Sequence, residues 1–86
     1  MSDTDAAPRA HAVLEHIVRS VVEVPDSARV VASADGDEVR LDVHVDRADI
    51  GRVIGRRGRV ATAIRTVVRA AAVNDGRSVT VDFVEP

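Results

Sequence analysis

The chain has 86 residues, enough for one domain with a thin core, and it has no cysteine, which excludes a disulfide framework and a thiolate zinc site. No apolar run approaches the length of a membrane span. A small secreted domain usually carries disulfides, so we expect a cytoplasmic protein that does not enter the membrane. The formal net charge is −2, and there is one aromatic residue, Phe83, which excludes nucleic-acid binding built on stacked aromatic side chains.

An amphipathic helix is predicted over residues 8–22. Pro8 suits a first helical turn, where its missing N–H needs no partner, and Pro25 stops the helix. The apolar residues recur at helical spacings: Ala10, Val13, Leu14, Ile17, Val18 and Val21. Residues 1–7 are small and polar, so we expect a flexible N-terminal tail followed by a single domain over residues 8–86.

A β-hairpin is predicted after this helix. A valine-rich strand covers residues 28–34, and Asp35-Gly36 is a type I′ turn signal, because both central residues of that turn take positive φ. The next strand, residues 39–45, alternates apolar with polar side chains and should have one buried face.

Two helices and a strand complete the chain. Asp46 is placed to cap a short helix over residues 47–54, in which Asp49 adds negative charge to the first turn. A longer helix covers residues 58–73. The turn Asn74-Asp75-Gly76 then leads to a last strand with alternating Val79, Val81 and Phe83. The apolar stripe of the long helix is expected to comprise Val60, Ile64, Val67, Val68 and Ala71, with Arg65 and Arg69 on the opposite, solvated face.

These elements predict an α+β fold with the order α-β-β-α-α-β. Because the last strand is reached by a two-helix crossover, it should run parallel to the second strand. The result is a three-stranded mixed sheet with the helices packed on one face. The other face should be exposed to water, and it carries Arg40, Asp42, His44, Ser78, Thr80 and Asp82.

The most informative segment joins the two predicted helices and reads Ile50-Gly51-Arg52-Val53-Ile54-Gly55-Arg56-Arg57-Gly58-Arg59-Val60. Residues 50–69 carry 6 Arg and no acid, whereas residues 1–46 carry 4 Arg and 10 acids. Glycine permits a tight turn, the start of the next helix favours an anion, and guanidinium groups suit phosphate oxygens. The segment therefore predicts a phosphate-binding loop. The G-x-x-G pattern alone is also compatible with a tight turn between two helices whose arginines are simply solvated.

The stretch from Val53 to Gly58 resembles the V-I-G-x-x-G signature of KH domains, and the element order is that of the type II, prokaryotic arrangement. More closely, Gly51 to Val68 is similar to the small single-KH bacterial proteins of the KhpA type, and the resemblance extends over about residues 8–84. It implies a type II KH fold and RNA binding with little sequence selectivity. It also implies a role as an RNA chaperone or post-transcriptional regulator.

The resemblance further assigns roles to individual residues. It places Gly55, Arg56, Arg57 and Gly58 in the phosphate-contacting loop, and Ile54, Val60 and Ile64 in an apolar groove wall or the core beneath it. Apart from the resemblance, a cation at a helix start opposes the dipole, which favours an RNA contact for Arg59, and Arg52 is an equal candidate beside the loop. Generic KH signatures place a branched aliphatic residue three positions after the second glycine. Here Ala61 stands there, which leaves the shape of the groove open. KH modules clamp about four nucleotides of single strand across such a loop.

The resemblance also implies partners. Members of this family associate with themselves and with a larger Jag-type KH protein, a pair linked to cell-wall and cell-shape control. A single loop without an aromatic platform should bind weakly and in a salt-sensitive way. We therefore expect a homodimer or a second RNA-binding partner, which would raise the effective affinity.

The same residues bear on other classes of function. A protein-interaction or dimerisation module, with RNA binding incidental, is the main alternative, and it would not need the arginine-rich loop. An enzyme, a cofactor and a small-molecule substrate are not expected, because the P-loop and Rossmann patterns are missing and no general base is placed near the loop. No metal site is expected, since His11 and His16 do not share a helix face and His44 is on a strand.

Overall fold

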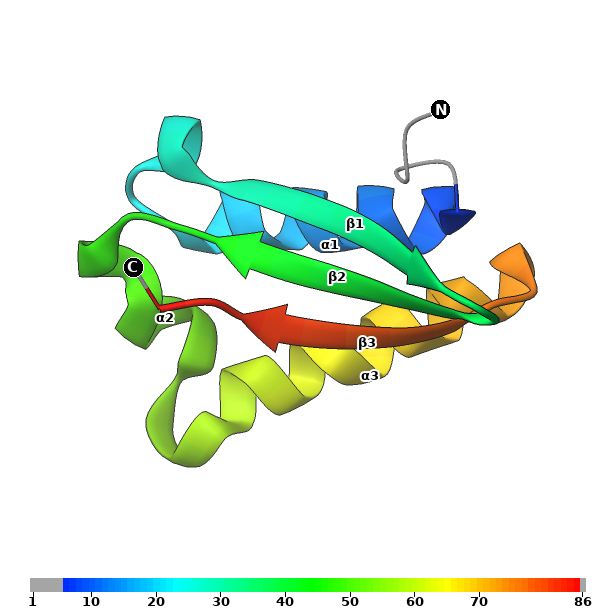
Figure 1. Ribbon diagram of the computed structural model, residues 1–86. Helices are drawn as coiled ribbons and strands as arrows, with labels where there is room; N and C mark the ends of the chain where they lie inside the picture. The colour runs from blue at the N-terminus through cyan, green and yellow to red at the C-terminus, as the bar shows by residue number, and fades with distance from the viewer. Residues whose placement is uncertain (1–5, 86) are drawn as a thin grey trace.

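The computed structural model describes residues 6–85, and its chain trace is shown in Figure 1. The regular elements are α1 (Pro8–Val21), β1 (Arg29–Asp35), β2 (Glu38–His44), α2 (Ile50–Ile54), α3 (Arg59–Asp75) and β3 (Ser78–Phe83). Short 3₁₀ turns cover Pro25–Ser27, Arg47–Asp49 and Arg56–Gly58. This confirms the predicted α+β order. No helix within the described residues is both long and apolar enough to cross a membrane.

The sheet has the strand order β1-β2-β3. The first two strands are antiparallel and β3 runs parallel to β2, with Val39 beside Val79 and Val43 beside Phe83, so the mixed sheet is confirmed. In Figure 1 the helices α1 and α3 lie behind the sheet, on one face. The apolar side chains of β2 and β3 point to that face and form the core with Leu14 and Val18 of α1.

The opposite sheet face is polar, as predicted. Arg40 is exposed and its guanidinium donates to Asp42 Oδ1 at 2.9 Å and to Asp82 Oδ2 at 2.7 Å. These two carboxylates are neighbours in the β2–β3 register, and Asp42, above all through its hydrogen bond, raises the pKa of the Arg40 guanidinium. The Arg40–Asp82 ion pair joins β2 to β3 on this polar face.

The hairpin turn differs from the expected type. Asp35 pairs with Glu38, so the two central residues are Gly36 and Asp37. Gly36 has a φ of 62°, whereas neither acidic neighbour has a positive φ. This pattern fits a type II′ turn, which requires positive φ only at the first central residue, and the predicted type I′ turn is wrong.

The core stripe of α3 is also displaced from the prediction. The buried residues are Ala61, Ile64, Val68 and Ala72. Val67, which was expected in the stripe, is 49% exposed, and Ala71 is only partly buried. The observed stripe advances by three and then by four residues. It includes the small residues Ala61 and Ala72, and their size lets α3 approach α1 and the sheet closely.

The end of α3 and the start of α1 are joined by hydrogen bonds. The predicted turn at Asn74-Asp75-Gly76 is wrong in part, because α3 continues to Asp75 and ends at Gly76 in the left-handed region. The Asp75 carboxylate accepts hydrogen bonds from the backbone amides of Arg9 (3.2 Å) and Ala10 (2.9 Å). The Arg9 guanidinium donates to the Asn74 carbonyl at 2.9 Å. The first amides of α1 are therefore capped from α3 rather than by a local side chain.

The predicted boundary at Pro8 needs a small correction. Ala7 was placed in the flexible tail, yet it is fully buried in the core. Its carbonyl accepts a hydrogen bond from the His11 amide at 2.9 Å. The ordered chain therefore includes Ala7, and the rest of the predicted tail, apart from Ala6, lies outside the described residues.

Candidate nucleic-acid interface

The predicted loop lies between α2 and α3, at the end of the molecule away from the hairpin turn (Figure 1). Its backbone has positive φ at three of four positions: 75° at Gly55, 55° at Arg57 and 71° at Gly58. The Gly58 amide donates to the Gly55 carbonyl at 3.2 Å and closes a 3₁₀ turn. Left-handed conformations in close succession turn the backbone sharply and leave the loop side chains pointing outward.

The two glycines are required for different physical reasons. A Cβ atom on Gly55 would lie 2.4 Å from Val60 Cγ2 and 2.9 Å from the Val60 amide nitrogen. Its φ of 75° and ψ of 175° also belong to a region that is essentially restricted to glycine. Gly58 has open space around its Cα, but its φ of 71° is left-handed. Gly55 therefore permits a close approach to the start of α3, and Gly58 permits the turn.

Three arginines surround this turn without internal partners. Arg56, Arg57 and Arg59 are exposed, and none forms an ion pair with a side chain in residues 6–85. The Arg59 amide donates to the Arg56 carbonyl. The first turn of α3 contains no acidic residue and no side-chain cap, so no side-chain charge there offsets the positive end of the helix dipole. Guanidinium and amide donors facing the same space can hold an anionic oxygen.

Arg52, predicted to contact RNA, has internal partners. Its guanidinium forms a short hydrogen-bonded ion pair with Glu23 Oε1, and its Nε lies 3.6 Å from Asp49 Oδ1. The side chain is about half exposed. An anion at this position would have to compete with Glu23.

Sequence reasoning missed the role of Asp49. It was predicted to add charge to the first turn of the helix, and it does lie there, but it is 1% exposed and makes no cap at α2. Its carboxylate accepts the backbone amides of Glu23 and Val24, each at 3.0 Å. Asp49 therefore fixes the segment after α1 against the helix that leads into the loop. The predicted cap at Asp46 is confirmed, because its side chain accepts from the Ala48 amide at 3.0 Å.

The apolar residues beside the loop divide into two groups. Ile54 and Val60 are half-buried, pack against the edge of the core and remain accessible. Ile64 is 4% exposed and Ala61 is 2% exposed, so both belong to the core. The structure thus places two of the three predicted wall residues where a ligand could touch them, and Ala61 is a close-packing contact of α3.

Arg65 is not on a solvated face, contrary to the prediction. Its Nε donates to the Val81 carbonyl at 3.2 Å, and its guanidinium lies 5.2 Å from the centre of the Phe83 ring. The side chain crosses from α3 to the outer edge of β3 and is half-buried. Arg69, one helical turn further along α3, is exposed as predicted.

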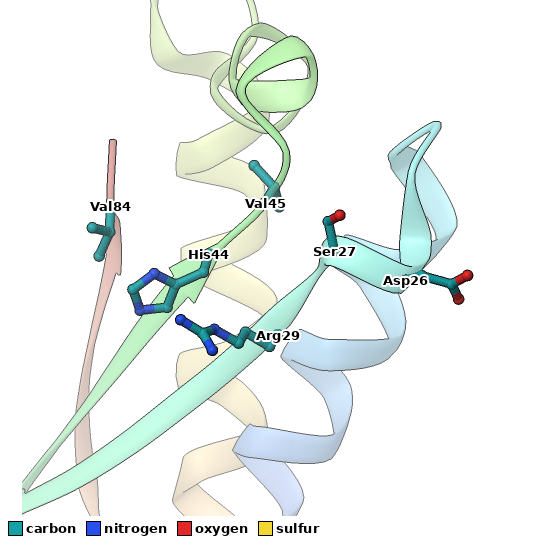
Figure 2. A pocket seen from close by; sticks show the side chains of 6 residues that line it. All are labelled: Asp26, Ser27, Arg29, His44, Val45 and Val84. Atoms are coloured by element: carbon teal, nitrogen blue, oxygen red, sulfur yellow. The ribbon is translucent and has the colours of Figure 1, made fainter. Parts of the chain in front are cut away.

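A separate cavity of about 460 Å³ lies where the chain enters β1 and leaves β2. Its lining residues are Asp26, Ser27, Arg29, His44, Val45 and Val84. Arg29 and His44 are cross-strand neighbours, and their side chains point toward one another in Figure 2. The three histidines are on α1 and β2, and within residues 6–85 no three potential metal ligands come together.

Comparisons with known proteins agree with this architecture. A family model described as KhpA/KhpB, KH domain matches residues 11–83. The chain is 50% identical over 72 residues to "RNA-binding protein KhpA" of Leifsonia xyli subsp. xyli, covering 84% of this chain and 92% of that protein. It is 40% identical over 72 residues to the protein of that name from Clostridium acetobutylicum, covering 84% and 96%.

A solved structure is also similar. It is the crystal structure of Era in complex with MgGDPNP and nucleotides 1506–1542 of 16S ribosomal RNA, with a TM-score of 0.59 and 16% identity. The similarity covers 86% of this chain and 28% of the Era chain. At that identity it supports the fold alone.

Proposed function

Because the chain belongs to the KhpA/KhpB family of KH domains, we propose that it is an RNA-binding protein that holds the backbone of single-stranded RNA on its Gly55–Gly58 loop. One observation carries this proposal: the loop presents exposed Arg56 and Arg57 at the uncompensated start of α3. The relatives named above carry RNA binding in their names, which supports the same class of ligand.

The geometry suggests how the loop acts. Phosphate oxygens accept hydrogen bonds from the guanidinium groups of Arg56 and Arg57, and the first amides of α3 add a fixed positive potential. Gly58, which faces open space, lets the strand approach the backbone without a side chain in the way. Ile54 and Val60 provide half-buried apolar surface for the bases next to the held phosphates. This arrangement recognises a strand by its backbone, so little sequence selectivity is expected.

The protein binds RNA rather than converting a substrate, and it needs no cofactor in this proposal. One loop provides few phosphate contacts, so binding should be weak and should fall with salt. A homodimer, or a complex with a larger Jag-type KH protein, would join two such sites and raise the apparent affinity. The expected setting is the cytoplasm, with a role as an RNA chaperone or post-transcriptional regulator.

The test compares RNA binding by the wild type and by Arg56→Asp/Arg57→Asp. A random-sequence single-stranded RNA pool should bind the wild type in a salt-dependent way and should not bind the double variant. Arg19→Asp/Arg29→Asp is the matched control, because it makes the same charge change on α1 and β1 and should retain most of the binding. Both residues of the loop pair are exposed, so the thermal midpoint should be nearly unchanged. Equal RNA affinity of a folded loop variant and the wild type contradicts the proposal.

Association with another protein chain is the alternative function, and α3 carries two exposed valines that could contribute to such a contact: Val67, which is 49% exposed, and Val73, which is 77% exposed. If association alone is the function, the loop variant should keep its mass by light scattering and its partner binding. If the loop variant instead loses RNA binding and no longer replaces the wild-type protein in the cell, RNA binding is the function.

A further inference from the structure

We propose that a cleft at the far end of α3 is a second phosphate-binding site, which takes the backbone of the same RNA strand that the loop holds. This inference rests on the proposed function. The cleft, hereafter the C-terminal cleft, has a volume of about 230 Å³ and lies between the last turns of α3 and the start of β3. Its lining residues are Arg69, Ala72, Val73, Arg77, Ser78 and Val79.

The C-terminal cleft combines two cations that the chain does not neutralise. Arg69 and Arg77 form no ion pair with any acidic side chain in residues 6–85. The Nε atom of Arg77 is buried and donates no hydrogen bond. A buried donor without a partner destabilises the free protein. An anionic oxygen entering the cleft would give that guanidinium the acceptor it lacks.

The backbone explains why Arg77 is held at the cleft. The Gly76 amide donates to the Val73 carbonyl at 3.1 Å, and the Arg77 amide donates to the Ala72 carbonyl at 3.3 Å. These two bonds form a Schellman motif, which fixes the residue after the glycine against the last turn of the helix. The adjacent carboxylate of Asp75 is engaged with the amides of Arg9 and Ala10. Within residues 6–85 this carboxylate forms no ion pair with Arg77.

The position of the cleft favours RNA as its ligand. The helix α3 has 17 residues and begins at the loop, so the cleft lies about 25 Å along the axis from the first site. Arg65 lies between the two ends, on the outer edge of β3. The sequence contains no acidic residue from 50 to 74. A strand held at the loop would thus pass arginines, and no carboxylate of residues 50–74, before it reaches the cleft. The cleft would extend the contact beyond the roughly four nucleotides of one loop.

The experiment uses strand length to separate the two sites. Binding of random-sequence RNA pools of about four and about twelve nucleotides is measured over a salt series for the wild type and for Arg69→Gln/Arg77→Gln. Only the longer pool should reach the cleft. For it, the double variant should bind roughly tenfold more weakly at low salt, and the slope of log K against log salt should be shallower by about 1.4 for two lost phosphate contacts. The short pool should bind both proteins equally.

Controls make each outcome decisive. Arg19→Gln/Arg29→Gln removes the same charge elsewhere and should leave the salt slope for the longer pool unchanged. Because the buried part of Arg77 could affect folding, Arg69→Gln alone is also measured, and it should show about half of the slope change. Equal losses for short and long pools, or no loss relative to the control pair, overturn the cleft as an RNA site. A third result also overturns it: the wild type binds polyglutamate, and the double variant loses that binding but still binds RNA as the wild type does. That result would assign the cleft to an acidic protein. Failure of the proposed function is distinct, because the wild type would then bind neither pool.

Discussion

A glycine in the left-handed conformation flanks each end of α3, but the two ends differ in their hydrogen-bond partners. Gly58 before the helix and Gly76 after it are both left-handed, with φ values of 71° and 66°. At the C-terminal end, the Asp75 carboxylate and the Asn74 carbonyl accept hydrogen bonds from the start of α1. At the N-terminal end, the loop arginines form no ion pair within residues 6–85, and the Arg59 amide donates only to the Arg56 carbonyl within the loop. The hydrogen bonds of Asp75 and Asn74 therefore join α3 to α1 at the C-terminal end, here called the closed end. The N-terminal end, here called the open end, makes no such connection and presents its arginines to an anion.

The largest effect should follow from Gly55→Ala, which breaks the open end of the helix. The added Cβ would meet the Val60 backbone, and the backbone conformation excludes a side chain, so we expect a loss of about 2–4 kcal/mol in the free energy of unfolding. Thermal unfolding should show the midpoint lowered by more than about 10 °C. The control is Gly51→Ala in α2, where nothing lies within 4 Å of the new atom. It should be neutral or stabilising by up to about 1 kcal/mol.

Equal midpoints for these two alanine variants would show that the approach of Gly55 to Val60 is not needed for the fold. The open end of α3 would then tolerate a side chain at position 55. RNA binding by the same two variants gives a second readout. Gly51→Ala should bind as the wild type does, because it leaves the loop backbone unchanged.

A smaller effect should follow at the closed end from Asp75→Ala. It removes the acceptor for the Arg9 and Ala10 amides, and loss of such a cap destabilises a protein by about 0.5–2 kcal/mol. For a domain of this size, each kcal/mol lowers the unfolding midpoint by about 4–8 °C. Asp26→Ala, at an exposed position, should change it little. RNA binding below the midpoint should persist in both variants, and a loss of binding by folded Asp75→Ala would contradict the division between the two ends.

The local signals in the sequence predicted the open end better than the closed end. The loop was found because its glycines and arginines are adjacent in the chain and each has a local physical reason. The strand alternation of β2 and β3 predicted the sheet for a similar reason. The pairing of Asp75 with α1 joins residues more than sixty positions apart, and no local pattern reports it. Asp75 was therefore read as a turn residue, which is the commonest use of Asp before Gly.

Other misses have the same cause. Asp49 resembles a helix-start charge, and only the folded chain brings the amides of Glu23 and Val24 to its carboxylate. Arg65 lies opposite the apolar stripe on a helical wheel, but β3 passes close enough to accept its hydrogen bond. Helical periodicity gives the direction of a side chain and not the identity of its neighbour. Contacts between polar residues of distant segments could therefore not be predicted from local sequence patterns.

The smallest predicted effect concerns Arg52, which lies near the open end yet is paired within the chain. Glu23→Gln removes the nearer of its two carboxylate partners and should free the Nη2 end of the guanidinium for phosphate, while Asp49 remains beside Nε. An exposed ion pair of this kind contributes little to stability, so the unfolding midpoint should change by only a few degrees. RNA affinity at low salt should rise by about two- to fivefold, with a steeper salt dependence by up to about 0.7 in the slope. Glu15→Gln, which releases Arg19 on α1 instead, is the matched control and should leave the slope unchanged. If Glu23→Gln and its control bind RNA alike, Arg52 is a structural residue like Asp75, and the open end of α3 consists of the loop arginines and helix amides alone.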